Sequence, residues 1–150
     1  MSDAGVVVRP FTPADAAEWL RMRLLLWPEE TPGGHAAEIA EWQARADAVV
    51  LVAVRPDGTL SGFAEVGARS IADGCTTSPV AYLEGWFVDA DARRTGIGTS
   101  LVRAAEAWAR AGGYREFASD VELDNVTSQR AHRALGFEEM GRAVLYLKPL

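Results

Sequence analysis

Apolar and polar positions along the chain follow two periods, which together predict a mixed α/β fold. Apolar, β-branched runs bounded by turn residues indicate strands, and apolar residues repeating every three to four positions indicate helices. Predicted strands cover residues 6–9, 49–55, 60–69, 80–88 and 116–121. Predicted helices cover about residues 12–27, 35–47, 96–111 and 125–136, and the apolar tail at 138–148 predicts one or two more strands.

The order of these elements is β-α-α-β-β-β-α-β-α-β. It predicts a mixed, mostly antiparallel central sheet with helices on both faces. Local signals support the boundaries. Thr12 and Asp15 are spaced as a capping box, Pro56-Asp57-Gly58 is a turn between two strands, and Asn125 or Thr127 can cap the fourth helix. The Thr31–Gly34 cluster is expected to end the first helix.

Length and composition narrow the class of protein. The chain has 150 residues, which suits a single domain over residues 1–150. Its net charge is -6 and it has no Lys/Arg run, which argues against nucleic acid as a partner. An acidic surface suits a cationic substrate, although the same charge can simply maintain solubility. Residues 1–5 do not resemble a leader and no run is apolar enough for a membrane helix, so a cytoplasmic protein without membrane contact is expected.

Cys75 is the only cysteine, so no intramolecular disulfide can form and no cysteine-rich metal site is expected. It is interpreted as a small packed thiol rather than a nucleophile. The most informative segment runs from Phe87 to Gly98, where an apolar strand leads through glycines into a helix. Free N–H groups at such a helix start attract anions, and Arg93 and Arg94 add positive charge where a pyrophosphate would bind.

Two other interpretations of the segment from Phe87 to Gly98 can be excluded. A dinucleotide fingerprint needs a third glycine near Leu101, and a nucleotide-hydrolase P-loop needs Gly-Lys-Ser/Thr; the chain has neither. A surface turn that only starts a helix remains open. However, Arg93-x-x-Gly96-x-Gly98 after an apolar strand resembles the coenzyme A pyrophosphate loop of the Gcn5-related N-acetyltransferases. Val8-Arg9-Pro10 and residues 131–137 resemble that superfamily at the expected places.

A closer resemblance is to the aminoglycoside 6'-N-acetyltransferases. The segments that carry it are Leu25-Leu26-Trp27-Pro28, Asp73-Gly74-Cys75, Ser78-Pro79, Leu83-Glu84-Gly85, Glu116-Phe117-Ala118-Ser119-Asp120, Asn125, Ser128-Gln129 and residues 134–139. This resemblance implies transfer of the acetyl group of acetyl-CoA to the 6'-amine of an aminoglycoside, by direct attack of the amine. It implies no covalent enzyme intermediate, and no metal is expected.

The resemblance also implies roles for individual residues. The cofactor site comprises Trp86, Phe87, Val88, Arg93, Arg94, Thr95, Gly96, Ile97, Gly98, Thr99 and Asn125. The pantetheine arm is expected to add like a half-strand beside residues 86–88. Asn125 matches a residue that binds this arm, and a helix cap is the alternative role.

Three residues are the catalytic candidates. Glu84 is expected to take the amine proton, because an acid isolated in an apolar strand has a raised pKa. An outward-facing strand residue is the alternative. Asp120 matches an acid that binds substrate amines, or it caps the following loop. His132 stands where relatives place the tyrosine that protonates the leaving thiolate, and a packed helix residue is equally open.

Other positions complete the expected substrate site. Trp27 matches a substrate-stacking position and otherwise belongs to the core. Tyr146 is an alternative proton donor, and His35 has no evident partner. Further acids were expected to make the cleft negative: Glu29, Glu30, Glu122, Glu138 and Glu139.

Two departures from the resembled enzymes bear on the substrate. Ile71 replaces a tyrosine and Gly141 replaces an acid, which keeps another amine, such as a polyamine or a protein N-terminus, as an alternative substrate. A non-catalytic sensor of acetyl-CoA is a further alternative. The apolar tail predicts an edge that needs cover, and the resemblance implies a homodimer with this segment at its interface.

Overall fold

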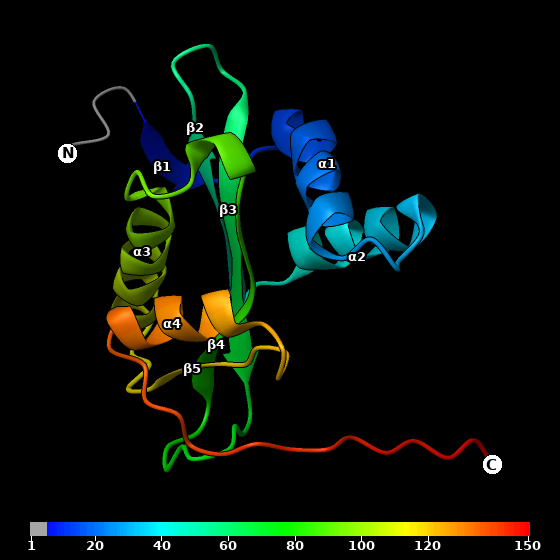
Figure 1. The fold of residues 1–150 in the computed structure, drawn as a ribbon, viewed down its shortest axis with the longest axis vertical. Coiled ribbons are helices and arrows are strands. Elements are labelled where there is room, and N and C mark those ends of the chain that lie inside the picture. The colour runs from blue at the N-terminus through cyan, green and yellow to red at the C-terminus, as the bar shows by residue number, and fades with distance from the viewer. Residues whose placement is uncertain (1–5) are drawn as a thin grey trace.

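A five-stranded sheet forms the centre of the computed structural model, which describes residues 6–150 (Figure 1). Its strands are β1 (Val7–Pro10), β2 (Ala48–Val54), β3 (Leu60–Arg69), β4 (Val80–Val88) and β5 (Phe117–Ser119). They lie in chain order; β1 to β4 pair antiparallel, and β5 pairs parallel with β4. The predicted mixed, mostly antiparallel sheet is confirmed.

Four helices cover the two faces of this sheet (Figure 1). The helices are α1 (Ala16–Leu26), α2 (Pro32–Ala44), α3 (Ile97–Ala111) and α4 (Val126–Ala134). One core lies under α1 and α2, with Trp19 and Phe63 fully buried in it. The other lies under α3 and includes Leu83 and Leu101, with Phe137 from the end of α4 packed against it. The sheet therefore separates two independent cores.

The helix starts follow the capping chemistry of the sequence. Thr12 N–H donates to Asp15 Oδ2 at 2.8 Å ahead of α1, and the bond from Arg9 to Asp15 lowers the pKa of that carboxyl group. Asn125 Oδ1 accepts from Ser128 N–H at 3.1 Å and so caps α4.

The second helix begins earlier than the sequence predicts. The Thr31–Gly34 cluster was expected to end the first helix, but Thr31 Oγ1 accepts from Gly34 N–H at 3.0 Å and Pro32 occupies the first turn. A threonine cap followed by proline starts a helix efficiently, which outweighs the low helix propensity of two glycines.

One extra residue in β4 changes which face of the sheet its side chains occupy. Glu65 pairs with Gly85 and Val66 pairs with Leu83, so Glu84 has no partner of its own in β3. Such a bulge turns two consecutive residues to the same face. Leu83 and Trp86 pack in the α3 core, whereas Glu84 and Gly85 both face the α1–α2 side.

The two last strands separate soon after they meet. β4 pairs with β5 only from Ala81 to Leu83, against Phe117 to Ser119. Beyond Leu83, the edge of β4 that faces away from β3 has no strand partner among residues 6–150. Residues 84–88 therefore have no strand partner on this side, and the splayed edge is one that a ligand with amide groups can extend.

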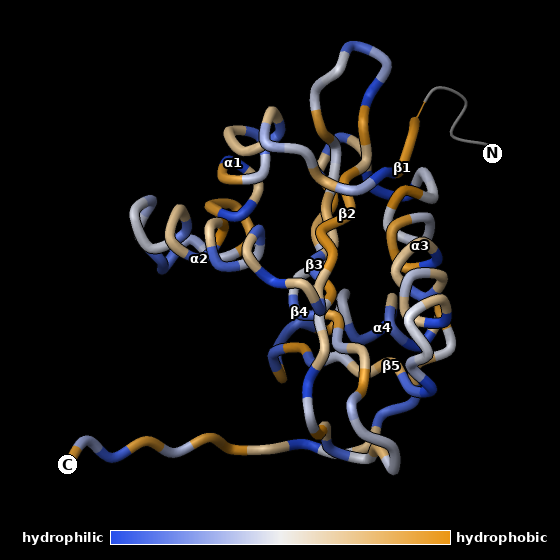
Figure 2. The backbone as a smooth tube through the Cα atoms, turned by 180° about the vertical axis from the view of Figure 1, so that it is seen from behind, coloured by the Kyte–Doolittle hydropathy of each residue, from blue (hydrophilic) through white to orange (hydrophobic). Residues whose placement is uncertain are grey.

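The tail forms no strand in this single chain, so that expectation is wrong as far as one copy is concerned. Residues 138–150 run away from the body as an extended segment (Figures 1 and 2). Leu145, Tyr146 and Leu147 are each more than 90% exposed. A strand requires a neighbouring strand to hydrogen-bond with, and none of the strand pairings among residues 6–150 includes the tail. None of the helices within residues 6–150 is long and apolar enough to cross a membrane.

Candidate functional site

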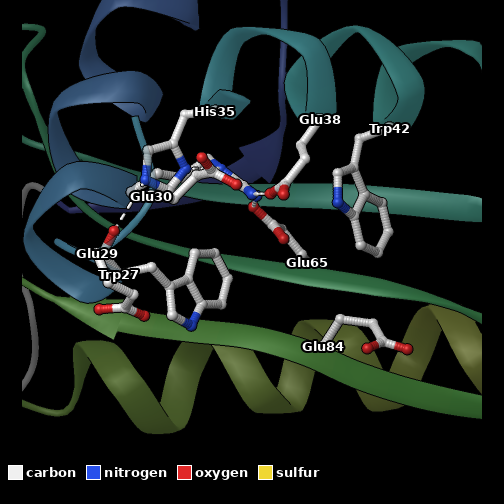
Figure 3. A pocket seen from close by; sticks show the side chains of 9 residues that line it. Trp27, Glu29, Glu30, His35, Glu38, Trp42, Glu65 and Glu84 are labelled. Atoms are coloured by element: carbon white, nitrogen blue, oxygen red, sulfur yellow. Dashed lines mark hydrogen bonds and ion pairs between the residues drawn. The ribbon is translucent and has the colours of Figure 1, made fainter. Parts of the chain in front are cut away.

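A cavity of about 440 Å³ opens on the α1–α2 side of the sheet, above β3 and β4 (Figure 3). It is lined by Arg23, Trp27, Glu29, Glu30, His35, Glu38, Trp42, Glu65 and Glu84. Five of these residues are carboxylates and only one is a guanidinium, so the cavity is strongly negative. Two indole rings provide flat apolar surfaces beside these charges. Such a lining suits a ligand with several ammonium groups on a ring scaffold.

Arg23 is the centre of a buried polar network at the base of the cavity. Its guanidinium bonds to Glu38 and Glu65, and its Nε donates to His35 Nδ1 at 3.2 Å. His35 Nε2 lies 3.0 Å from the main-chain oxygen of Trp27. The expectation that His35 lacks a partner is therefore wrong, because α1 and α2 bring together residues that no sequence pattern links. Burial raises the pKa of Glu65, and the charge of Arg23 opposes that rise.

Trp27 forms a wall of the cavity, as expected for a substrate-stacking residue. Its main-chain N–H ends α1 by donating to Arg23 O at 2.8 Å, which aims the indole at the sheet. A Cβ atom added to Gly85 would lie 2.7 Å from this ring, so the ring needs a glycine beneath it. The Arg23 guanidinium lies 4.7 Å from the ring centroid on Trp27 and holds the indole by a cation–π contact.

Glu84 reaches the same cavity, but the structure corrects its expected surroundings. Arg69 holds Glu84 in a bidentate pair, with N–O distances of 2.5 and 2.7 Å. Glu84 is therefore not an isolated carboxylate, as its apolar strand had suggested, but one half of an ion pair. The bulge places Glu84 beside a neighbouring-strand arginine that strand alternation alone does not put there.

Asp120 is exposed, directly after β5, and does not line the cavity. It accepts a hydrogen bond from the Tyr82 hydroxyl group. Burial, followed by this bond to Asp120, raises the pKa of Tyr82, so the phenol stays protonated as the donor. The Arg69 guanidinium lies 3.5 Å from the centre of the Tyr82 ring, so it links Asp120 to Glu84 through a row of polar contacts.

The segment from Arg93 to Thr99 has the form of an anion-binding turn. Gly96 has φ 89° and Arg94 has φ 63°, so the chain turns sharply before α3. Among residues 6–150, no acceptor takes a hydrogen bond from the N–H groups of residues 96–99. Four consecutive free donors at the positive end of a 15-residue helix form a site for a phosphate group.

Two hydrogen bonds join the end of β4 to the turn at residues 93–99. Trp86 Nε1 donates to Gly98 O at 3.2 Å, and Arg93 Nε donates to Val88 O at 3.0 Å. A Cβ atom on Gly98 would lie 3.2 Å from the Trp86 ring, so a larger residue at this position would push the turn away from the strand. The splayed edge of β4 and the anion-binding turn are thus continuous.

His132 projects from α4 toward the place where β4 and β5 separate. Its Nδ1 is 2.7 Å from the main-chain oxygen of Ser128, which can only accept, so Nδ1 carries a proton. Its Nε2 is 2.8 Å from Ser119 Oγ, and its ring packs edge-on to Trp86 at 5.3 Å. Asn125 lies at the start of the same helix, where its side chain is engaged as the cap.

Cys75 fits the interpretation as an unreactive thiol. Burial and the nearby charge of Glu116 raise its pKa, so less of it is in the nucleophilic thiolate form. The part of the chain that the structure describes also has no cluster of three His, Cys, Asp or Glu residues placed to hold a metal ion.

The structure brings Trp27 and Glu84 into one cavity and leaves Asp120 and His132 outside it. Of the acids expected in the cleft, Glu29 and Glu30 line the cavity, whereas Glu122, Glu138 and Glu139 do not. Sequence reasoning missed Arg23, Glu38 and Glu65. Glu65 carried the signal that singled out Glu84, an acid within a strand of apolar residues. Arg23 and Glu38 sit on helices whose apolar pattern is weak, so the sequence does not mark a charged residue there as buried.

Comparisons with known proteins agree with this geometry. The model of the acetyltransferase (GNAT) family matches residues 16–137. Aminoglycoside N(6')-acetyltransferase type 1 of Klebsiella aerogenes is 48% identical over 151 residues, which cover 99% of each chain. The enzyme of the same name from Stenotrophomonas maltophilia is 42% identical, over 95% of this chain and 93% of its own.

Solved structures give the same result. Aminoglycoside antibiotic 6'-N-acetyltransferase AAC(6')-Ih from Acinetobacter baumannii superposes with a TM-score of 0.90 at 37% identity, over 97% of this chain and 99% of its own. AAC(6')-Iy, solved in complex with the bisubstrate analogue CoA-S-monomethyl-acetylneamine, has a TM-score of 0.91 at 34% identity, with the same coverage.

Proposed function

Because this chain belongs to the acetyltransferase (GNAT) family, we propose that it transfers the acetyl group of acetyl-CoA to the 6'-amino group of aminoglycoside antibiotics, conferring resistance to them. The similarity to enzymes of that name over nearly the whole chain supports this function. The observation that carries the substrate class is the cavity with five carboxylates, one guanidinium and two indoles. We further propose that residues 1–150 form one acetyltransferase domain, which acts in the cytoplasm, where acetyl-CoA is available.

The free N–H groups of residues 96–99 fit the pyrophosphate of acetyl-CoA, with Arg93, Arg94 and Thr95 around them. Main-chain groups of Trp86, Phe87 and Val88 at the splayed edge of β4 fit the amides of its pantetheine arm. Asn125 is the weakest member of this set, since its side chain already caps α4. When bound, acetyl-CoA supplies the thioester carbon that the amine attacks.

Glu84 lies on β4, between this edge and the cavity. We assign it the role of accepting a proton from the attacking amine. An ammonium group has no lone pair and must lose a proton before it can attack. Both oxygens of Glu84 bond to Arg69, and their remaining lone pairs can accept this proton, directly or through one water molecule. Trp27 offers its indole to a sugar ring, and Asp120 can bind a further amine outside the cavity.

His132 is assigned the role of donating a proton to the leaving thiolate. With Nδ1 protonated by its contact to Ser128 O, an imidazolium presents its second proton at Nε2, toward Ser119 and the gap between β4 and β5. Tyr146, the alternative donor, lies on the exposed tail of its own chain.

The proposed function predicts release of free thiol from acetyl-CoA when kanamycin or tobramycin is added. The rate is expected to saturate with both substrates and to depend on the 6'-amine. A kanamycin derivative with a 6'-hydroxyl group in place of the amine is the matched control, and it should give only background release. Absence of release with every aminoglycoside that carries a 6'-amine would contradict the substrate class.

A different amine is the second candidate substrate, and two positions favour it. Ile71 is 78% exposed and Gly141 has open space around it, so neither supplies the polar group that the resembled enzymes place there. Spermidine and a short peptide with a free N-terminus, tested in the same assay, separate this candidate from the first. A higher kcat/KM for either than for kanamycin would favour it.

We also propose that the protein is a homodimer in which the tail of one copy packs on the other. The tail exposes Val144, Leu145, Tyr146 and Leu147 in an extended conformation, and such a segment is a template for pairing with a second chain. Burying four such side chains on a partner would stabilise the pair by several times the ~1.5–3 kcal/mol of a single one, before association costs.

Light scattering is expected to give twice the chain mass of 16.2 kDa at micromolar concentration. Deleting residues 142–150 should reduce it to the mass of one chain, because the apolar segment is lost. Substituting Arg103, which lies on the exposed side of α3, with alanine is the control and should leave the mass at that of two chains. A single-chain mass for the intact protein would refute the dimer.

A further inference from the structure

Glu65 presents one unused oxygen to the acidic cavity. The residue is 1% exposed, yet it lines the cavity together with Glu38 and Glu84. Its Oε1 accepts from Trp19 Nε1 at 2.9 Å and from Arg23. No hydrogen bond from residues 6–150 reaches its Oε2. Among the described residues no buried side-chain oxygen or nitrogen lacks a partner, so Oε2 is the end of this carboxylate that opens onto the cavity, where it can accept from a bound donor.

Contacts on both sides also fix the orientation of the Glu65 carboxylate, so that Oε2 keeps facing the cavity. Trp19 from α1 and Arg23 from the next turn fix Oε1 from the helix side. On the strand side, a Cβ atom added to Gly85 would be 3.2 Å from Oε2, so Gly85 leaves the room that Oε2 faces. In Figure 3 the Glu65 carboxylate lies between the indoles of Trp27 and Trp42, with Glu38 next to it.

The position of Glu65 in the sheet separates it from the reacting amine. The proposed cofactor edge lies between β4 and β5, and Glu84 is on β4, next to that edge. Glu65 is one strand farther away, on β3, or about 4.8 Å in the pairing direction. An amine that reacts on the side of Glu84 that faces this edge leaves Glu65 to a different nitrogen of the same substrate.

We propose that Glu65 is a specificity-determining residue of the acceptor site, and that its Oε2 binds a second ammonium group of the substrate, one that is not acetylated. This inference rests on the proposed function. It makes the site selective for acceptors with two or more amines, because the amine that reacts at the cofactor edge is then not the one that Oε2 binds. Arg23 offsets only part of the local charge, since Glu29, Glu30 and Glu38 line the same cavity.

Burial raises the pKa of Glu65, which supports this role. In the free protein, burial disfavours the charged form of the Glu65 carboxyl group, and a bound ammonium group would favour that form. An amide at this position can still accept from Trp19 and Arg23 at the position of Oε1, and Glu38 stays as a charged partner of Arg23. The substitution Glu65→Gln therefore keeps these contacts but replaces the oxygen that faces the cavity with an NH2 donor.

The test compares kinetics and binding for the wild-type protein and Glu65→Gln. For kanamycin, KM is expected to rise about 10- to 100-fold, the effect of losing a hydrogen bond to a charged group, while kcat and the KM for acetyl-CoA stay nearly unchanged. For 6-amino-6-deoxyglucose, which has a single amine, kcat/KM is expected to be the same in both proteins. Titration calorimetry with kanamycin provides the same comparison without turnover.

Two further variants exclude general damage to the fold. Glu65→Asp keeps the charge but withdraws it by one methylene, so it should fall between the wild type and Glu65→Gln in kanamycin affinity. Glu18→Gln removes a partly buried, ion-paired carboxylate from α1 outside the cavity, and should leave kanamycin affinity unchanged.

Kanamycin affinity within twofold of the wild type in Glu65→Gln would overturn the inference, as would equal losses for kanamycin and the single-amine sugar. If the wild-type protein itself neither binds nor acetylates any aminoglycoside, the proposed function fails instead. The two failures are therefore distinguishable.

Discussion

Replacing Glu84 with glutamine is expected to lower kcat for aminoglycoside acetylation by about 10²- to 10⁴-fold, the usual contribution of a positioned general base. Glutamine keeps the shape of the side chain and can still accept from Arg69, but it cannot take a proton from the amine. The measurement is initial thiol release at saturating acetyl-CoA and kanamycin. The kcat/KM of the variant should also rise more steeply with pH than that of the wild type, because only amine deprotonated by solvent can then react.

The matched control is Glu106→Gln on α3, which removes another carboxylate paired with arginine, far from the cavity lining. It is expected to leave kcat unchanged. Acetyl-CoA affinity should be the same in all three proteins, since Glu84 is not among the groups assigned to the pyrophosphate. A Glu84→Gln enzyme with the wild-type kcat would remove Glu84 as the base.

Replacing Arg23 with methionine is expected to lower the free energy of unfolding by about 3–5 kcal/mol. Arg23 is 1% exposed and bonds to Glu65, Glu38 and His35, so its removal leaves the buried Glu65 charge uncompensated. In a chain of this size, the melting temperature should fall by roughly 10 °C. Urea unfolding followed by tryptophan fluorescence measures the change directly.

A second substitution tests the cause of that loss. The double variant Arg23→Met/Glu65→Leu removes both charges and is expected to recover most of the lost stability, since an apolar pair of similar volume often replaces a buried ion pair without cost. The same variant should still bind kanamycin poorly. If the double variant is no more stable than Arg23→Met alone, then the lost stability comes from the contacts of Arg23 with His35 and Trp27, and not from the uncompensated charge of Glu65.

The regular elements could be predicted from the sequence because their signals are local. Apolar alternation and turn residues locate β3 and β4 within a residue or two, and the glycines before α3 mark its first turn. The start of α2 was predicted too late, since the capping geometry of Thr31 outweighs the propensity of the glycines that follow. The tail was predicted as strand from its composition, but pairing needs a neighbour that a single chain does not supply.

The candidate site was harder to predict because its chemistry depends on contacts between distant segments. The turn at residues 93–99 is contiguous and could be recognised, although its role in binding acetyl-CoA stays a prediction. Glu84 was singled out as the acceptor of the amine proton, a role that stays a prediction; it does line the cavity, but its pairing with Arg69 depends on a bulge that no periodicity reveals. Glu65 and Arg23 come from different elements and meet only when α1 packs on β3.

The order of these residues along the chain has a consequence for how the protein can diversify. Every residue that lines the cavity lies between positions 23 and 84, and the turn and strand end assigned to the acyl donor lie between 86 and 99, with Gly85 at the boundary. A single genetic crossover near that glycine would exchange the whole cavity lining and keep the turn and strand end assigned to acetyl-CoA, while Asp120 would stay with the donor part. New acceptors can thus be acquired by recombination without rebuilding the machinery for the donor.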